Sequence, residues 1–492
     1  MQELGVVIVK NSKENLTKNA KIMQTIKYSY VLTEDKEYNA FLACTLKRCF
    51  VKDKDFIRKQ MRSIGLLGAI AIGIGGMVGG GIFAVLGEAV SLAHGATPVA
   101  FAIAGIVAIL TAYSYAKLSV TYQSEGGTVT FIDKAFGDNI LSGSVNLMLW
   151  LSYLVTISLY ATAFASYGET FFTHQSVWLH HGLIVVAIIV PAVINLVSAS
   201  FVGKSETIIV VIKVSLLILV IFAGASYVEP QRMSPVHWGT SLSIITAGMI
   251  IFVAYEGFEL IANSAQDIKN PDKNLPRAFY ASVLIVVALY ILIAIITVGN
   301  VSEDVLMKTK DYALAEAAKP SLGVMGFKLV AFAALLSTFS AINATIYGNA
   351  RLGYIIAKDG KLPHSLMDEG KKSGVPFKGV LYTTLFSLIL ANSIDLTEIA
   401  IIGSAGFLLI FLLVNISAFK LFKEIGANRS ILFISSVLSF LALATLLFHT
   451  YTSNPKAVII FMSFIIISTL FELIYGRYVR GHFFERAYKT HP

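Results

Sequence analysis

Apolar stretches of about 20 residues recur along this chain from residue 63 to residue 478, and a helix needs that length to cross the roughly 30 Å hydrocarbon core of a membrane. Of the 492 residues, 56% are hydrophobic and 14% are charged, whereas soluble domains carry roughly 25% charged residues. Polar turns would divide a soluble core of this hydrophobicity into shorter elements. The sequence therefore predicts an all-α, polytopic membrane protein.

Hydropathy predicts about 12 membrane-spanning helices. The expected spans are residues 63–90, 97–121, 142–168, 178–199, 204–227, 242–263, 278–299, 326–350, 379–393, 397–420, 430–450 and 456–476. They form a transmembrane domain of residues 61–480, followed by a tail of residues 481–492. Residues 1–60 fit no span: they are interpreted either as a polar, disordered cytoplasmic extension or as the product of an upstream start codon, since Met61 directly precedes the first span. No signal peptide is recognised among them.

Positively charged residues gather on one set of connections between the spans. This set begins before the first span and goes on to include Lys134, Lys204, Lys269, Lys361 and Lys378. The opposite set holds only Arg232, Lys308, Lys310, Lys319 and Lys456. Because Lys and Arg are enriched in cytoplasmic loops, both termini are predicted to be cytoplasmic, in a multi-pass protein of the cell membrane. The net charge of +9 is then explained by the topology, as cytoplasmic loops next to membrane lipid, and no nucleic acid partner is expected.

Two connections carry patterns of their own. Residues 123–138 include Glu-Gly-Gly at 125–127 and are predicted to form a cytoplasmic interfacial loop. In segment 301–323, the stretch from Ala313 to Ala318 has helical spacing and predicts a short extracellular helix between spans seven and eight.

The first span contains a concentration of glycines that a continuous helix does not favour. Six lie within nine residues, namely Gly73, Gly75, Gly76, Gly79, Gly80 and Gly81, and each costs about 1 kcal/mol of helix propensity relative to alanine. One interpretation is close helix packing, because Gly75/Gly79 and Gly76/Gly80 are GxxxG pairs. Such packing does not require consecutive glycines, so we expect the helix to unwind near Val78–Gly81.

The sixth span carries two carboxylates and a glycine at mid-span depth, in the stretch Phe252 to Glu259. Charges at that depth are costly and rarely face lipid. One interpretation is that Glu256 and Glu259 pair with a basic residue for packing only. The other is a second interrupted helix, since spans one and six are five apart, as in an inverted repeat of five helices.

Two facing helix breaks form a site for a zwitterion. The amides at the start of a half-helix attract a carboxylate, and the carbonyl groups at the end of a half-helix attract an ammonium.

Span five contains Lys213, nine residues after Lys204 and so about 13 Å further along a helix. A snorkelling side chain covers part of that distance. The functional interpretation is that Lys213 points into the bundle, where burial penalises its charged form. A lysine that can lose its proton near the zwitterion site is a candidate proton carrier.

The sequence lacks residues that other functional classes require. Cys44 and Cys49, the only cysteines, lie before the first span, so the core is expected to hold no disulfide and no thiolate metal site. The nine histidines fall in loops or near span ends, whereas an enzyme needs clustered catalytic groups or metal ligands. We therefore expect no enzyme activity, no cofactor and no metal site. A sensor that binds without transporting is disfavoured, because no folded signalling domain is attached.

Several motifs together resemble the amino acid–polyamine–organocation (APC) superfamily, and the likeness is strongest to the ApcT-type proton-coupled amino acid transporters. The likeness covers roughly residues 63–480. It rests on Gly-Gly-Met-Val-Gly-Gly-Gly-Ile-Phe at 75–83, Glu-Gly-Gly at 125–127, Ala-Tyr-Glu-Gly-Phe-Glu at 254–259, Asn-Pro-x-x-Asn-Leu-Pro-Arg-Ala at 270–278, Asn-Ala-Thr-Ile-Tyr-Gly at 343–348 and Ala-Lys-Asp-Gly-Lys-Leu-Pro at 357–363.

The resemblance implies a LeuT-like fold and a secondary active transporter that carries amino acids by alternating access, with proton symport. Its two inverted repeats would be residues 63–227 and 242–420, followed by two extra helices in 430–476, and helices 1 and 6 would be discontinuous. An exchanger is the alternative mode of transport. The oligomeric state and the amino acids carried are not implied.

The resemblance also implies roles for individual residues around the breaks. Backbone amides of the unwound segment Met77–Ile82, above all those of Gly80, Gly81 and Ile82, would hold the substrate carboxylate, with Val78 and Gly79 between them. The carbonyl groups of Met77, Val253 and Glu256 would hold the amine. Lys213 would fill the place of a sodium ion and contact the first helix near Gly75.

Further side chains are implied less specifically. Ser337, Thr338 and Ser340 on span eight would face the same spot as Lys213, and Glu259 is a further candidate. Many relatives carry an aromatic gate at the position of Val253, and here Phe252 is the nearest aromatic residue. Glu256 stands where the family usually has an apolar residue, so either it favours cationic amino acids or it is a local titrating group.

Overall fold

The computed structural model describes residues 62–197, 199–368 and 375–480, with side chains left out of the description at 199–207, 479 and 480. The chain divides after Arg62, and the unit that begins at Ser63 is described here. The predictions for residues 1–60 and for the tail 481–492 lie outside the described residues.

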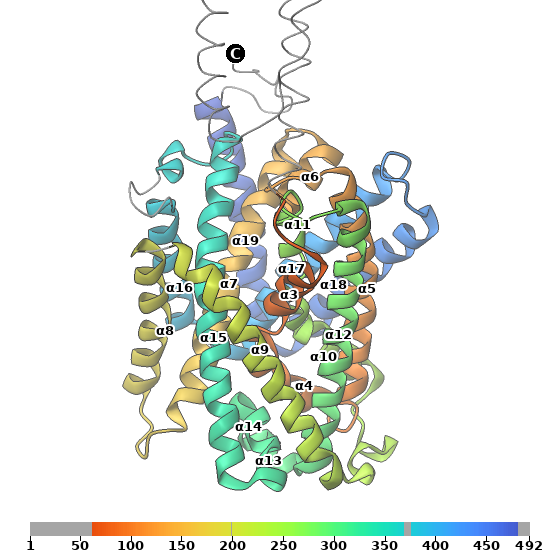
Figure 1. Ribbon diagram of the computed structural model, residues 1–492, viewed down its shortest axis with the longest axis vertical. Coiled ribbons are helices and arrows are strands. Elements are labelled where there is room, and N and C mark those ends of the chain that lie inside the picture. Colours follow the sequence, from red (N-terminus) through yellow and green to blue (C-terminus); the bar gives the residue numbers. More distant parts are fainter. Residues whose placement is uncertain (1–61, 198, 369–374, 481–492) are drawn as a thin grey trace, which may run out of the picture. The chain divides into compact units, whose positions relative to one another are not determined.

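Helices make up nearly all of this unit, labelled as in Figure 1. Before the sixth span they are α3 (Leu66–Met77), α4 (Gly81–Ala93), α5 (Thr97–Thr121), α6 (Thr128–Phe136), α7 (Ile140–Glu169), α8 (Val177–Val197) and α9 (Ala199–Gly224). The sixth span consists of α10 (Ser241–Ile250), the 3₁₀ segment η4 (Ile251–Tyr255) and α11 (Leu260–Asn263). After it come α12 (Pro271–Asn300), α13 (Glu303–Lys308), α14 (Ala313–Ala317), α15 (Lys319–Lys358), α16 (Phe377–Ser393), α17 (Leu396–Lys420), α18 (Arg429–Ser453) and α19 (Pro455–Tyr475).

The expectation of a polytopic membrane protein is confirmed, with up to eleven spans among the described residues where about 12 were predicted. Ten helical segments are long and apolar enough to cross a membrane, and the bent pair α3–α4 makes an eleventh. Helix α16 has 17 residues, at the short end of the roughly 17–25 residues that a spanning helix needs. It corresponds to the ninth predicted span. The all-α class is confirmed as well: two isolated β-bridges, Ile64 to Ile268 and His94 to Trp238, are the sole β pairings in the described ranges.

The prediction of an interfacial loop at residues 123–138 was wrong in part, because nine of these residues form helix α6. The helix begins after Gly127, whose φ of 44° is open mainly to glycine. It then buries Val129, Phe131 and Ile132 on one face. Apolar burial at helical spacing therefore outweighs the polar composition of the segment.

A partly buried ion pair ties helix α6 to Lys361, three residues after the end of α15. Lys361 donates to Asp133 at 2.5 Å and lies 3.6 Å from Asp138, and Asn146 of α7 donates to Asp133 at 3.1 Å. Burial raises the pKa of the Asp133 carboxyl above its ordinary value, against the opposing effect of Lys361. This cluster fixes α6 to the bundle at one end of the helices (Figure 1).

The short helix predicted at 313–318 is confirmed as α14, and α13 precedes it. Both lie at the opposite end of the bundle from α6 (Figure 1). Lys310, between them, donates to Glu88 of α4 at 2.9 Å and to Thr397 of α17 at 3.2 Å. His94, which follows α4, lies 2.7 Å from Glu303 of α13. These contacts hold the connecting segment against α4.

Both predicted helix breaks are present. Helix α3 ends at Met77 and α4 begins at Gly81, with a bend of 48° between them. Val78 has a ψ of 51°, outside the helical region. In the sixth span, η4 ends at Tyr255, and Gly257 has a φ of 119°, which strongly favours glycine.

The two broken spans pack against each other, α3 beside α11 and α4 beside α10 (Figure 1). A Cβ placed on Gly76 would lie 2.5 Å from the carbonyl oxygen of Gly257, and one on Gly257 would lie 2.3 Å from the carbonyl carbon of Gly76. A Cβ on Gly81 would lie 2.7 Å from Cα of Ala254. Both interpretations of the glycines therefore hold, unwinding and close packing, because the backbones of the two interrupted helices are in direct contact.

We expect Gly76→Ala to destabilise the protein, because its methyl group would meet backbone atoms that cannot rotate away. Overpacking of this kind costs roughly 1–3 kcal/mol. The matched control is Gly182→Ala in α8, where an added Cβ meets nothing within 4 Å. The thermal unfolding midpoint of the purified protein in detergent should fall for Gly76→Ala and stay level or rise for Gly182→Ala. Equal midpoints for the two variants would contradict the backbone contact.

Candidate functional site

The backbone carbonyl groups at the end of α3 have lost their helical partners and are met by side chains. Lys213 of α9 donates to Gly75 at 2.9 Å, Tyr290 of α12 to Met77 at 2.7 Å, and Ser337 of α15 to Gly79 at 2.7 Å. In a membrane each unpaired backbone group would cost several kcal/mol. Three helices that are distant in sequence therefore stabilise the first break.

The amides at the same break have no such partners. Within the described residues, the N–H groups of Gly79 and Gly80 donate no hydrogen bond. They directly precede the N-terminus of α4, where the helix dipole is positive. The ring of Tyr160 lies against this turn, since a Cβ on Gly80 would meet Tyr160 Cδ1 at 2.3 Å. The break therefore presents donors that suit an anionic group.

The second break is held by polar contacts of its own. Ser404 of α17 accepts a hydrogen bond from the Val253 amide at 3.0 Å and donates to the Ile250 carbonyl at 2.5 Å. Tyr290, which bonds to the first break, also lies 3.2 Å from the carbonyl oxygen of Ala254. The Gly257 amide donates to Glu259 at 2.7 Å, so the carboxylate caps the break from within its own span.

The two buried carboxylates accept hydrogen bonds from hydroxyl groups of α7. Glu256, 4% exposed, accepts from Thr156 at 3.3 Å and Tyr160 at 3.4 Å. Glu259, 1% exposed, accepts from Tyr153 at 3.0 Å. Neither belongs to any of the ion pairs that the described part of the chain contains.

Lys213 points into the bundle. Its side chain is 1% exposed, and its Nζ donates to the Gly75 carbonyl near the end of α3, the position that the resemblance implied for it. The snorkelling interpretation required the side chain to reach the membrane surface, and the side chain does not. Ser337 also reaches the first break, whereas the hydroxyl of Thr338 donates to Ala334 in its own helix at 2.7 Å. Ser340 is buried at 3% exposure.

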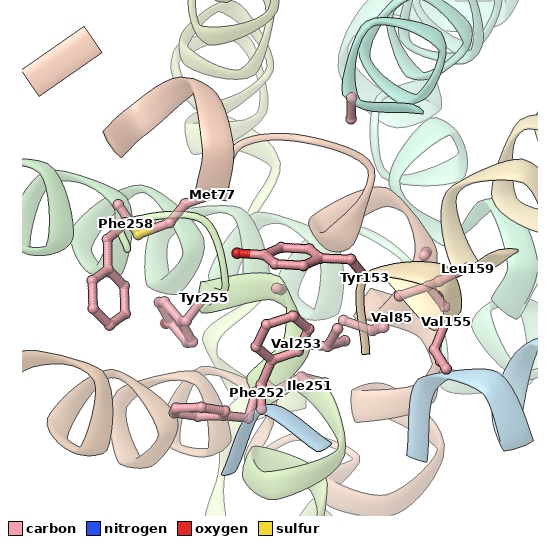
Figure 2. Packing of buried hydrophobic residues seen from close by; sticks show 14 of the residues in the cluster. Met77, Val85, Tyr153, Val155, Leu159, Ile251, Phe252, Val253, Tyr255 and Phe258 are labelled. Carbon is pink, nitrogen blue, oxygen red and sulfur yellow. The ribbon is translucent and has the colours of Figure 1, made fainter. Parts of the chain in front are cut away.

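A cavity of about 150 Å³ lies between α3, α7, α11 and α15. At its closed end it is lined by Tyr153, Tyr160 and Glu256, which are buried. Toward α6 its walls include Asn263 and Thr345, which are partly exposed. Figure 2 shows Tyr153 among the labelled residues around the breaks, with its hydroxyl oxygen on the side where Met77 and Phe258 lie. The cavity thus runs from the face that carries α6 to the breaks.

Of the predicted site residues, Gly75, expected to take part in proton coupling, and Glu256, expected to bind substrate, line this cavity. Met77, Val78, Ile82 and Val253 are fully buried and do not line it, and Gly79–Gly81 lie at the turn covered by Tyr160. Phe252 is also buried, with its ring 5.8 Å from that of Phe411 in an edge-to-face contact. The aromatic residues at the closed end of the cavity are instead the tyrosines of α7.

Sequence reasoning missed three tyrosines: Tyr153, Tyr160 and Tyr290. Their signal was available, since each is a phenol near the middle of an apolar span, where a buried hydroxyl needs a partner. Tyr153 and Tyr160 are also seven residues apart, which places them on one face of a helix. The signal did not reveal which neighbouring helix supplies the partner.

Comparison with known proteins identifies the family of this chain. The family profile described as amino acid permease matches residues 68–452. The uncharacterized protein MJ0609 of Methanocaldococcus jannaschii is 35% identical over 434 residues, 87% of this chain and 98% of that protein. The inner membrane transport protein YbaT of Escherichia coli is 32% identical over 419 residues, 85% of this chain and 97% of that protein.

A third relative, the branched-chain amino acid permease BcaP of Bacillus subtilis, is 23% identical over 380 residues, 74% of this chain and 81% of that protein. The profile spans most of the chain and most of its membrane helices. The resemblance to the APC superfamily is therefore confirmed, and the names of these relatives describe transporters and permeases rather than enzymes. This chain is a multi-pass membrane protein that belongs to the amino acid permease family.

Proposed function

We propose that this permease carries an amino acid across the cell membrane by proton-coupled symport, with the substrate bound between the two helix breaks. The observation that carries the proposal is that the N–H groups of Gly79 and Gly80 donate no hydrogen bond among the described residues and lie beside carbonyl groups of both breaks. An amino acid has a carboxylate to accept from the amides and an ammonium to donate to the carbonyls. A fold of two inverted five-helix repeats would place the two breaks opposite each other.

The substrate carboxylate would sit at the N-terminus of α4, on amides of the segment Gly79–Ile82. The ammonium would lie among the carbonyl oxygens of both breaks, donating to that of Met77 in the first break and to the nearest of those of Val253, Ala254 and Glu256 in the second. Each of these oxygens has two lone pairs, so the bond that Met77 accepts from Tyr290 leaves room for a second. Tyr160, against the Gly80 turn, would shield the bound zwitterion from the cavity.

Lys213 would couple transport to the proton. As an ammonium it makes a charge-assisted hydrogen bond to Gly75, and such bonds are roughly twice as strong as neutral ones. Loss of the proton would weaken the hold of α9 on the end of α3. Proton release would therefore make the end of α3, which forms one wall of the substrate site, less firmly held.

The direction of access follows from the cavity and the ion pairs. The cavity leads to the breaks from the face that carries α6, which we assign to the cytoplasm from the Lys and Arg distribution. At the other end, the pairs Glu88–Lys310 and His94–Glu303 hold the α13–α14 segment on α4. The arrangement fits an inward-facing state of an alternating-access cycle, in which these pairs would open on the outward-facing side.

Proton coupling predicts accumulation driven by a pH gradient. Purified protein in liposomes should concentrate labelled amino acid when the outside is made acidic, without sodium. Lys213→Ala should abolish that accumulation because the ammonium that holds Gly75 is lost. Uptake that follows a sodium gradient and ignores pH would contradict the coupling, and uptake that requires substrate on the opposite side would indicate an exchanger instead.

Glu256 predicts the class of side chain that the site prefers. A buried carboxylate without an ion pair favours a ligand that brings a positive charge, because pairing offsets part of the cost of burial. We expect lysine, arginine or ornithine to compete best in a panel of unlabelled amino acids. Glu256→Gln should lower the apparent affinity for these cationic competitors at least tenfold and that for neutral ones less than twofold. A uniform change across the panel would assign Glu256 a structural or titrating role.

The cavity predicts a water path from the α6 face. In a background without Cys44 and Cys49, Gly348→Cys should react rapidly with a water-soluble maleimide, because Gly348 lines the cavity and nothing lies within 4 Å of an added Cβ. Ala350→Cys, two residues further along α15, is the control and should react slowly, since Ala350 is fully buried. In oriented vesicles, labelling of Gly348→Cys from the extracellular side alone would contradict the assignment of the cavity to the cytoplasm.

A further inference from the structure

A single hydroxyl group joins the two helix breaks. Tyr290 of α12 donates to the Met77 carbonyl, at the end of α3, at 2.7 Å, and its oxygen lies 3.2 Å from the carbonyl oxygen of Ala254, in η4. Lys213 and Ser337 bond to the first break, and Ser404 bonds to the second. The Tyr290 hydroxyl thus sets the spacing between one backbone carbonyl of each break.

The Tyr290 ring holds this hydroxyl in one place. It is fully buried, with its centroid 5.9 Å from that of Phe101 and 5.3 Å from that of Tyr255. Tyr255 in turn donates to the Phe101 carbonyl at 2.9 Å, so the three rings form a cluster between α5, η4 and α12. A ring packed on two sides cannot swing away when a ligand enters, because protein interiors are close-packed.

Around the Tyr290 hydroxyl there are fewer hydrogen-bond donors than acceptor lone pairs. The hydroxyl has one proton for two carbonyl oxygens, and each carbonyl has two lone pairs. The shorter distance gives the proton to Met77, which leaves spare acceptor capacity on Met77, on Ala254 and on the phenol oxygen itself. Three oxygens with spare lone pairs match the three donors of an ammonium group.

We propose that Tyr290 is a positioning residue for the ammonium group of the substrate: it holds the carbonyls of Met77 and Ala254 at the spacing that an ammonium requires. The inference rests on the proposed amino acid site and adds to it a side chain from α12. It assigns the recognition of the amine, as distinct from that of the carboxylate, to an oxygen cluster shared by both breaks.

Tyr290→Phe tests this inference because it removes the hydroxyl and keeps the ring. The matched control is Tyr167→Phe, which removes another fully buried hydroxyl that donates to a backbone carbonyl, that of Phe83 at 3.3 Å, and bonds to neither Met77 nor Ala254. The full-length protein in detergent would be screened by thermal shift with the 20 proteinogenic amino acids. The one that binds best, and its des-amino acid, would then be used as probes for dissociation constants up to high millimolar concentrations.

We expect Tyr290→Phe to weaken the binding of the amino acid at least tenfold and that of the des-amino acid less than twofold. The reason is that the lost hydroxyl positions only the carbonyl groups that meet the amine. Tyr167→Phe should change the affinity for neither probe more than twofold, and the unfolding midpoints of the two variants should be similar.

Wild-type affinity for the amino acid in Tyr290→Phe would overturn the inference alone. Equal weakening of both probes in Tyr290→Phe would also overturn it, because a general distortion of the breaks acts on carboxylate and amine alike. Absence of amino acid binding by the wild-type protein would instead overturn the proposed function, and this inference with it.

Discussion

The direct contact of backbone between Gly76 and Gly257 is the constraint on which the site depends. At this contact, the first and sixth spans approach so closely that a single methyl group on either residue would meet the other's peptide group. Such an approach brings two helix ends together in the middle of the bundle. It also explains why the glycines gather at the breaks, where each costs helix propensity: the contact requires residues without a Cβ.

Once two helices are broken inside a membrane, their backbone groups must find partners. The carbonyl groups obtain them from Lys213, Tyr290, Ser337 and Ser404, on four different helices. The amides of Gly79 and Gly80 obtain none among the described residues. This difference between satisfied acceptors and unsatisfied donors is the basis on which we propose the first break as a site for an anionic group.

Much of this arrangement could be predicted from the chain. The breaks follow from clustered glycines and mid-span carboxylates, and the inward direction of Lys213 follows from its distance to the nearest span end. These predictions use local sequence and the cost of charge in lipid, which a single sequence contains. The roles of Tyr153, Tyr160 and Tyr290 depend on which helix faces which, and hydropathy does not supply this. For the same reason α6 was predicted as a loop: its buried face becomes favourable only against α17 and α7.

We propose that an amino acid binds between the two breaks, with its carboxylate at the N-terminus of α4. The most direct test is a cryo-electron microscopy map of the protein with a bound amino acid, at a resolution that separates carboxylate from amine. We expect the carboxylate within hydrogen-bond distance of the amides of Gly79–Gly81 and the amine toward the carbonyl groups of Met77 and Ala254. Density for the substrate elsewhere in the bundle, with these amides unoccupied, would contradict this proposal.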